Sequence, residues 1–449
     1  MATMWSDEVV TSENFQEWID MTEKHKIVVV GGGVAGLDLA SHVSGKPARK
    51  LGWDVRLVDR ELAHVWKPML HTIAAGTADT GAHQTAYLSQ ARRRGFSFEL
   101  GEVVAVDRER SLIRIGPVMA TGEEVLPARS LQYDTLVLAA GSRANDFGTP
   151  GVAEHCMTID SRREALAFND RLRIALIRSV ASQRPLSVAV VGAGATGVEL
   201  VAELIRLADV LELHGALGLR GNLSITLIES QDRILGPFPP KVAQAALEVL
   251  ERLGITVLMS ARVQSADDTG FALADGRRVD ADLKLWAAGV RAPAFIADIE
   301  GLQHSRLGQV IVDRTLMAVG DPKILALGDC ASVQTSEGEA PLPTTAQAAY
   351  QQCMYLCRHL PAIVQGLRVP DFRYHDFGSL VSLGGYDAYG TLARFGLFEG
   401  GFLRGRVAQL GHSLLYRRHQ TRLYGPLRGS LLWLVDILDS HVRSPGRFS

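Results

Sequence analysis

Residues 26–40 read KIVVVGGGVAGLDLA, and residues 187–201 read SVAVVGAGATGVELV. In each stretch a short apolar run precedes Gly-x-Gly-x-x-Gly, and apolar residues at helical spacing follow it. A strand, a glycine-rich turn and a helix in this order are typical of a βαβ unit that binds a dinucleotide. Because the whole pattern occurs twice, the sequence predicts two dinucleotide-binding units in one α/β chain.

Each glycine of such a turn has its own task. The first permits the tight bend, the second lets the backbone approach a pyrophosphate, and the third lets the helix pack closely on the strand. Three glycines take these places in each turn: Gly31, Gly33 and Gly36 in the first, and Gly192, Gly194 and Gly197 in the second. A single turn of this kind also arises for packing alone, so the argument rests on the repetition.

An acidic residue should end the next strand, where it holds a ribose hydroxyl. WDVRLVDR supplies Asp59 after the first turn, and SITLIES supplies Glu229 after the second. We expect the first unit, which opens the chain, to bind FAD and the second to bind a nicotinamide nucleotide. A carboxylate repels a 2′-phosphate, so Glu229 favours NADH over NADPH, although Arg233 lies close by in the sequence.

Composition excludes several classes of protein. The 449 residues suffice for about three domains, and the net charge of −2 gives no indication of nucleic-acid binding. The four cysteines are too few and too scattered for a disulfide scaffold or a zinc site, so we expect a reducing compartment, no bound metal and buried thiols: Cys156, Cys330, Cys353 and Cys357. Residues 1–25 are acidic, lack the apolar core of a signal peptide and are expected to form a short extension.

Three further segments end strands in glycine. They read YDTLVLAAGS at 133–142, with Gly141; ADLKLWAAGV at 281–290, with Ala288 and Gly289; and KILALGDCAS at 323–332, with Gly328 and Asp329. Together with both glycine turns, they resemble the two-dinucleotide-binding flavoproteins, which include the disulfide reductases and the type II NADH:quinone oxidoreductases. The resemblance implies that Gly328 and Asp329 meet the ribityl chain of FAD, and that Ala288 and Gly289 belong to the NADH site.

Within this family, disulfide reductases carry two redox cysteines soon after the first turn. Residues 64–88, HVWKPMLHTIAAGTADTGAHQTAYL, contain none. WKPMLH, GATGVELVAEL and AQAAYQQ instead resemble the type II NADH:quinone oxidoreductases, which reduce a membrane quinone without pumping protons. The implied chain order is an extension (1–25), an FAD-binding domain in two parts (26–146 and 291–380) around an inserted NADH-binding domain (147–290), and a C-terminal membrane-associating region (381–449).

The resemblance also assigns roles near the flavin. PLPTTAQAAYQQ predicts a helix capped by Thr344 or Thr345, with Ala346 beside the flavin. Gln347 and Gln351 share one face of that helix and are expected to line the quinone site, the alternative being a polar face in solvent.

Glu199 is expected in the first turn of its helix. The resemblance makes it an aid to proton transfer, and the alternative is a carboxylate placed there by the helix dipole. Lys67 and His71 are expected to shape the flavin site.

The last segment is basic and partly apolar. Residues 401–449 hold eight arginines and two aspartates, and no lysine or glutamate. PLRGSLLWLVDILDSHV places four leucines on one stripe: Leu427, Leu431, Leu434 and Leu438. Such a helix lies in a membrane interface or packs in a core or homodimer. The lipid solubility of quinone favours peripheral attachment to the cytoplasmic face of the cell membrane. Both glycine turns precede Gly401, so truncation there is expected to leave FAD bound.

Three rival functions remain from the sequence. A sulfide:quinone oxidoreductase would need redox cysteines near the flavin, for which only Cys156 and Cys330 are candidates. A ferredoxin or rubredoxin reductase would lack the basic amphipathic tail. A redox-sensing interaction flavoprotein would show negligible turnover.

Overall fold

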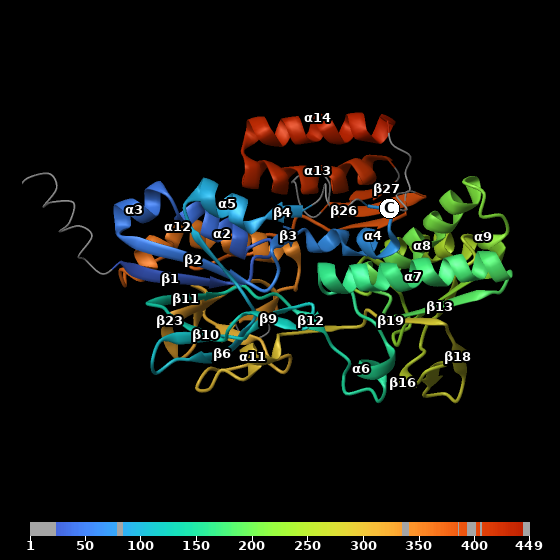
Figure 1. Cartoon of the computed structure of the whole chain (residues 1–449), viewed down its shortest axis with the longest axis horizontal. Helices are drawn as coiled ribbons and strands as arrows, with labels where there is room; N and C mark the ends of the chain where they lie inside the picture. Colours follow the sequence, from blue (N-terminus) through green and yellow to red (C-terminus); the bar gives the residue numbers. More distant parts are fainter. Residues whose placement is uncertain are drawn as a thin grey trace, which may run out of the picture.

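The computed structural model describes residues 24–78, 84–334, 341–384, 386–392, 401–404 and 406–442. Most of the predicted N-terminal extension, residues 1–23, lies outside the described residues. Two α/β units stand side by side, and two C-terminal helices lie along one edge of the pair (Figure 1).

The first unit is built on an eight-stranded sheet in the order β24-β21-β22-β23-β11-β1-β2-β5. Its strands are β1 (His25–Val30), β2 (Trp53–Asp59), β5 (Ser97–Leu100), β11 (Thr135–Leu138), β21 (Val310–Val312), β22 (Met317–Ala318), β23 (Asp321–Ala326) and β24 (Ala331–Val333). The neighbours β23, β11, β1, β2 and β5 run parallel, and Leu136 lies in register with Ile324. Strands from both sides of the inserted unit therefore share one sheet.

The second unit repeats the arrangement on a smaller scale. A four-stranded parallel sheet has the order β15-β14-β13-β19. Its strands are β13 (Leu186–Val191), β14 (Leu223–Ile228), β15 (Thr256–Leu258) and β19 (Leu283–Trp286). The chain crosses between the units where β12 (Arg143–Ala144) pairs antiparallel with β20 (Val290–Arg291).

Helices cover both of these sheets, and small antiparallel sheets of two or three strands form separately from them. The helices are α2 (Gly36–Val43), α3 (Lys46–Leu51), η1 (Lys67–Met69), α4 (Leu70–Ala75), α5 (Tyr87–Arg94), α6 (Val152–His155), α7 (Arg162–Ser182), α8 (Ala195–Leu213), α9 (Leu219–Asn222), α10 (Pro240–Arg252), α11 (Ala294–Ala297), η2 (Gly328–Cys330), α12 (Ala346–Val364), α13 (Arg406–Tyr424) and α14 (Pro426–Val442). The remaining strands are β3 (Ala63–Val65), β4 (Gln84–Ala86), β6 (Val103–Asp107), β7 (Leu112–Ile115), β8 (Val118–Ala120), β9 (Glu123–Leu126), β10 (Arg129–Gln132), β16 (Val263–Ala266), β17 (Gly270–Leu273), β18 (Arg278–Asp280), β25 (Leu380–Leu383), β26 (Asp387–Leu392) and β27 (Gly401–Arg404).

Burial explains why the central strands are almost wholly apolar. A parallel strand covered by helices on both faces has no face left for water, so successive residues are apolar rather than alternating. Val28, Val29 and Val30 in β1, and Val190 and Val191 in β13, follow this rule and are all buried. Each unit thus has its own apolar core, centred on the strand that leads into a glycine turn.

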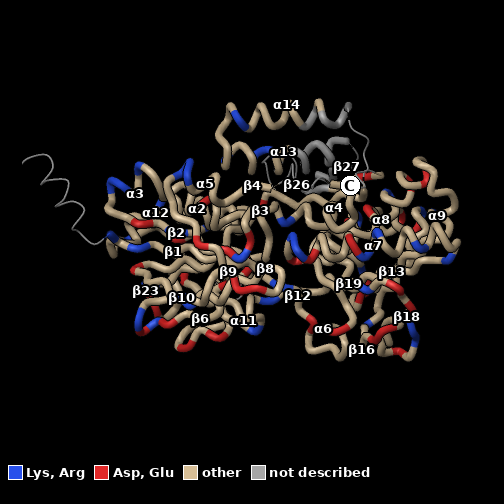
Figure 2. The backbone as a smooth tube through the Cα atoms, viewed as in Figure 1, with Lys and Arg blue, Asp and Glu red and all other residues tan. Residues whose placement is uncertain are grey.

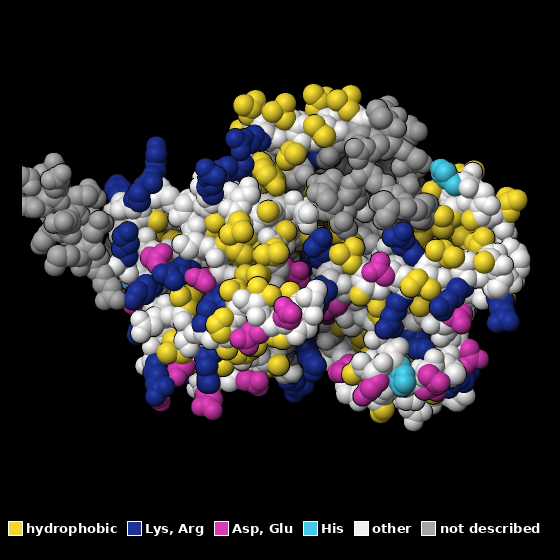
Figure 3. Space-filling view, viewed as in Figure 1, with side chains coloured by type: hydrophobic (Ala, Val, Ile, Leu, Met, Phe, Trp, Pro, Cys, Tyr) yellow, Lys and Arg dark blue, Asp and Glu magenta, His cyan; other side chains and the backbone are white. Residues whose placement is uncertain are grey.

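The C-terminal helix α14 presents apolar side chains outward. The predicted stripe is exposed: Leu427 is 76% accessible, Leu431 55%, Leu434 53% and Leu438 57%. Figure 3 shows hydrophobic side chains along the outer edge of α14, and Figure 2 shows a basic residue near the start of this helix. Within the described part of the chain, no helix is both long and apolar enough to span a membrane.

Candidate functional site: two glycine turns, a cavity and a buried carboxylate

The first and third glycines of both turns pack too tightly for any side chain. A Cβ on Gly36 would lie 1.9 Å from the carbonyl oxygen of Gly31, and one on Gly197 would lie 2.0 Å from that of Gly192. Gly31 and Gly192 have φ values of +99° and +103°, a region that glycine occupies at little cost. Gly192 also faces the backbone of Ala288, where a Cβ would lie 2.7 Å from the Cα atom. The two turns are therefore built alike.

The second glycines face open space. A Cβ built on Gly33 or Gly194 would meet no atom within 4 Å. Close approach of a pyrophosphate to the backbone needs such an opening at the start of a helix, where the N–H groups point outward. Both turns fit a dinucleotide on this geometry.

Asp59 ends β2 and ties down the first turn. Its Oδ2 accepts the Gly32 N–H at 2.6 Å, and its Oδ1 accepts the Glu61 N–H at 2.8 Å. Burial raises the pKa of the Asp59 carboxyl, although these backbone bonds oppose the shift. The acid lies beside the turn, as the sequence predicts.

Glu229 repeats this pattern at the end of β14. Its Oε2 accepts the Ala193 N–H at 2.8 Å, and its Oε1 accepts the Gln231 N–H at 2.9 Å. Each acid thus bonds the residue after the first glycine and the residue two positions beyond itself. Arg233 donates to the carbonyl of Gly236.

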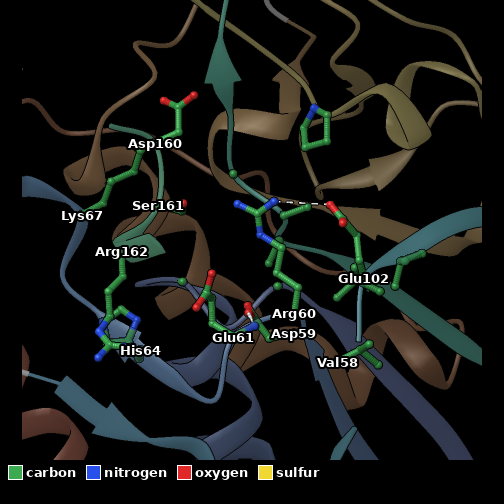
Figure 4. Close-up of a pocket in the computed structure, with 18 of the residues that line it drawn as sticks. Val58, Asp59, Arg60, Glu61, His64, Lys67, Glu102, Asp160, Ser161 and Arg162 are labelled. Atoms are coloured by element: carbon green, nitrogen blue, oxygen red, sulfur yellow. Dashed lines mark hydrogen bonds and ion pairs between the residues drawn. The ribbon is translucent and has the colours of Figure 1, made fainter. Parts of the chain in front are cut away.

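A cavity of about 200 Å³ opens beside the first turn. Gly31, Gly33, Asp59, Lys67 and Gly141 line it. Figure 4 shows Lys67, Asp160 and Ser161 on one side, facing Arg60 and Glu102 across it. The cavity lies at the carboxyl ends of parallel strands, the usual place for a ligand in an open α/β sheet.

Polar contacts connect Lys67 to the Gly-Asp segment. The Lys67 ammonium lies 3.2 Å from Ser142 O and 3.3 Å from its Oγ, and that hydroxyl donates to Asp329 Oδ2 at 2.8 Å. Gly328, at φ +72°, donates its N–H to Gln352 Oε1 at 2.6 Å. Segments distant in sequence therefore meet at one end of the cavity.

The α12 helix begins as predicted. Thr345 is its N-cap and accepts the Ala348 N–H through its hydroxyl at 3.2 Å, so Ala346 is the first helical residue. Gln347 Nε2 lies 2.7 Å from the Tyr374 hydroxyl. Gln351 exchanges two bonds with the backbone of His375, at 2.7 and 2.9 Å.

These bonds place the glutamine pair against the segment 374–377, so this half-exposed polar face is partly covered by protein. Their contact with a quinone stays a prediction.

Glu199 is buried, with 7% of its surface exposed. Its Oε1 accepts the Ser382 N–H at 3.0 Å, and its Oε2 lies 3.4 Å from His71 Nδ1. Burial raises the pKa of Glu199 to about 8, and the nearby Glu203 adds to the rise. Such a carboxyl is largely protonated at neutral pH.

One expectation about Glu199 is wrong in detail. The α8 helix begins at Ala195, so Glu199 is its fifth residue and lies in the second turn rather than the first. A dipole effect fades beyond the first turn and favours the charged form. The raised pKa shows that burial under α4 and β25 dominates instead.

The loop after β19 completes the second site. Gly289 has φ +63°, and a Cβ there would lie 2.4 Å from the Phe147 ring. Ala288 lies against Gly192 and so adjoins the second turn, whereas Gly289 packs against Phe147 and Asn145.

Several residues at the first site belong to no sequence motif. Tyr87 and His64 both contact the carbonyl of Gly32, at 2.9 Å each. Asp160 lines the cavity and accepts the Ala144 N–H. The sequence offers no signal for these residues, because their segments reach the site only through the fold.

The cysteines do not form a redox pair at the cavity. Cys156 and Cys330 are free thiols, neither lines the cavity, and burial raises the pKa of each to about 12. A thiol with so high a pKa is a poor nucleophile at neutral pH. This observation weighs against sulfide oxidation. Among the described residues, no group of three or more potential ligands is arranged to hold a metal.

Comparison with known proteins agrees with this geometry. Residues 25–353 match the model of the pyridine nucleotide-disulphide oxidoreductase family. That match defines the class: an α/β oxidoreductase with parallel sheets that binds FAD and a nicotinamide nucleotide.

Relatives narrow the class further. The chain is 35% identical to the type II NADH:quinone oxidoreductase of Haemophilus influenzae, over 93% of this chain and 98% of the relative. It is 28% identical to the type II NADH:quinone oxidoreductase of Mycobacterium tuberculosis, over 93% and 89%. The chain belongs to the type II NADH:quinone oxidoreductases, within the pyridine nucleotide-disulphide oxidoreductase family.

Solved structures share the fold. NDH2 of Plasmodium falciparum in complex with NADH aligns with a TM-score of 0.78 at 19% identity, over 93% of this chain and 98% of the other. The sulfide:quinone oxidoreductase of Aquifex aeolicus aligns with a TM-score of 0.70 at 16% identity, over 92% and 95%. At these identities the likeness concerns the fold alone.

Proposed function

We propose that the protein oxidises NADH and reduces a membrane quinone, with FAD as its resident cofactor. The observation that carries this proposal is the duplicated turn, in which an open second glycine and a carboxylate at the strand end recur in two separate sheets. When bound, FAD supplies the capacity to accept a hydride and to pass on two electrons. The chain's own residues bind, orient and supply protons.

The residues of the first turn fit FAD. The open backbone at Gly33 suits the diphosphate, and Asp59 suits a ribose hydroxyl. Asp329 and Lys67, connected through Ser142, suit the polar chain between diphosphate and ring. The start of α12 at Ala346 offers N–H groups that favour negative charge.

The residues of the second turn fit NADH. Gly194 is open, which suits the diphosphate, Glu229 beside the turn suits the ribose, and Ala288 lies against Gly192 at the edge of the proposed site. The carboxylate of Glu229 disfavours a 2′-phosphate.

Quinone reduction consumes protons, and Glu199 is suited to supply one. Its raised pKa keeps a proton available at neutral pH in a buried place. His71 lies on one side of the carboxyl, and the backbone of β25 on the other. Gln347 and Gln351 are proposed to face the quinone, together with the segment that they hold.

The C-terminal region is proposed to attach to the membrane as a peripheral element on the cytoplasmic face. The exposed stripe on α14 supports this, since apolar surface that faces water gains free energy by entering a lipid interface. The arginines around it suit anionic lipid. A homodimer would cover the same stripe and is the competing outcome.

We retain the chain division proposed from the sequence. The crossing pair β12 and β20 lies beside the boundaries at 146/147 and 290/291. On this division, 26–146 and 291–380 form the FAD-binding domain, and 147–290 form the NADH-binding domain.

Turnover with different substrates tests the proposal. Purified protein is supplied with NADH and a soluble ubiquinone or menaquinone analogue, with sulfide and quinone, or with NADH and a ferredoxin. Of the three substrate pairs, we expect only NADH and quinone to give sustained turnover. Sulfide-dependent quinone reduction, or turnover only with ferredoxin, would overturn it.

A further inference from the structure

The carbonyl of Gly32, between the first two glycines of the first turn, has unusual partners. It accepts the Tyr87 hydroxyl at 2.9 Å and contacts His64 Nδ1 at 2.9 Å. The matching carbonyl of the second turn, Ala193 O, accepts the backbone N–H of Leu235 at 2.8 Å. Side chains thus hold the peptide in the first turn, whereas a backbone N–H from the loop after β14 holds it in the second.

The tautomer of His64 follows from this contact. A carbonyl can only accept, so His64 Nδ1 carries the proton and Nε2 must accept. Its Nε2 lies 2.9 Å from Nε2 of His419, which is therefore the donor. The bonds run from His419 to His64 to Gly32. Burial lowers the pKa of His64 to about 3 and that of His419 to about 4, so both rings are neutral at physiological pH.

His419 comes from the C-terminal helix α13, which other contacts fix in place. Two nitrogens of Arg422 lie 2.8 Å from Asp38 Oδ2, and Asp38 is a buried residue of α2, the helix that follows the first turn. Arg94 donates to the carbonyls of Arg422 and Leu423 at 2.9 and 2.7 Å. The helix that carries His419 is therefore anchored on the first unit.

The geometry of the peptide between Gly32 and Gly33 connects these side chains to the cavity. In a trans peptide the C=O of one residue and the N–H of the next point in opposite directions, and the described residues include no cis bond. With its carbonyl held by Tyr87 and His64, the Gly32 peptide directs the Gly33 N–H the other way. Gly33 lines the cavity and faces open space. Donation to a peptide carbonyl also polarises the peptide and strengthens its N–H as a donor.

We propose that His419 and His64 are positioning residues for the FAD diphosphate, through which the docked C-terminal helix strengthens FAD binding at the first turn. The proposal rests on the proposed binding of FAD there. By linkage, FAD also strengthens the docking of α13. The NADH turn is held by the backbone N–H of Leu235, not by α13, and is unaffected.

The test compares FAD binding in three variants of the full chain. His419→Phe keeps a ring and removes the donor, whereas His419→Gln restores an N–H donor. Tyr416→Phe, on the same helix, is the matched control. Protein stripped of flavin is titrated with FAD, and the phosphorus resonances of bound FAD are recorded by ³¹P NMR.

We expect His419→Phe to raise the FAD dissociation constant about 3- to 10-fold, the loss for one neutral hydrogen bond. Its diphosphate resonances should shift, His419→Gln should recover most of the affinity, and KM for NADH should not change. Unchanged affinity and resonances in His419→Phe would overturn the proposal. Absence of FAD binding in the wild-type protein would instead overturn the proposed function.

If His419→Phe does not fold, Tyr87→Phe replaces it, because Tyr87 is the other donor to the Gly32 carbonyl. Weaker FAD binding with shifted phosphorus resonances then supports the role of this peptide. Unchanged values contradict it, and with it the proposal.

Discussion

Replacing Glu199 by Gln removes a buried titration while preserving the shape of the side chain. The pKa of about 8 leaves about nine in ten Glu199 carboxyls protonated at pH 7. If this proton reaches the quinone, the rate of flavin reoxidation follows the protonated fraction of Glu199. At pH 9 the rate should be about one tenth of the plateau that it reaches at low pH. We expect Glu199→Gln to be slower at neutral pH and to lack the midpoint near pH 8.

The same shift predicts a change in stability. The folded-state pKa is raised above its ordinary value of 4.5, so the stability that this group contributes is complete below about pH 4.5 and is lost as pH rises toward 8. Glu199→Gln abolishes that loss. The midpoint temperature of thermal unfolding of Glu199→Gln should therefore rise relative to that of the wild type as pH increases from 5.5 to 8.

Stopped-flow mixing separates the two half-reactions. Flavin reduction by NADH and reoxidation by a quinone analogue are each followed from pH 6 to 10. The control is Glu251→Gln, which removes an exposed carboxylate from α10. His71 and Glu203 also face Glu199 and can shift its midpoint. An unchanged midpoint of reoxidation in Glu199→Gln would refute the assignment.

Three further predictions concern the other ligands. Glu229→Gln should raise KM for NADH about 10- to 100-fold and narrow its preference over NADPH, since hydrogen bonds to charged groups contribute about 1.5–3 kcal/mol; an unchanged ratio of the two constants would remove Glu229 from the site. Gln351→Leu should slow reoxidation by quinone and spare reduction by NADH, with Gln244→Leu on the surface of α10 as the control; equal slowing of both steps would indicate a structural role. Truncation after Gly425 should release the protein from anionic liposomes at high salt, because each leucine of α14 that is buried in the lipid interface contributes about 1.5–3 kcal/mol. Full-length protein that never co-sediments would contradict membrane attachment.

The local parts of the site could be predicted from the sequence. Glycine spacing determines the turns, and the acid at the end of the next strand follows from the βαβ unit, so Asp59 and Glu229 lie where expected. Thr345 caps α12 as predicted, because a cap depends only on neighbouring residues.

Contacts between distant segments could not be predicted. His64 and His419 are 355 residues apart, and no periodicity relates them. The burial that raises the pKa of Glu199 comes from α4 and β25, which pack on α8 from elsewhere in the chain.

The expectation that truncation at Gly401 leaves FAD bound assumed that motifs alone define the cofactor site. Removing α13 would also remove His419 and Arg422 from the first unit. We now expect that truncation to weaken FAD binding.

The most direct measurement of the central claim is anaerobic sequential mixing of the purified protein. One equivalent of NADH is added first, and one equivalent of a quinone analogue second, while the flavin absorbance is recorded. The two-site arrangement predicts bleaching of the flavin by NADH and full recovery with quinone, with one quinol formed for each NADH consumed. A flavin that NADH does not bleach, or a bleached flavin that quinone leaves unchanged, would contradict it.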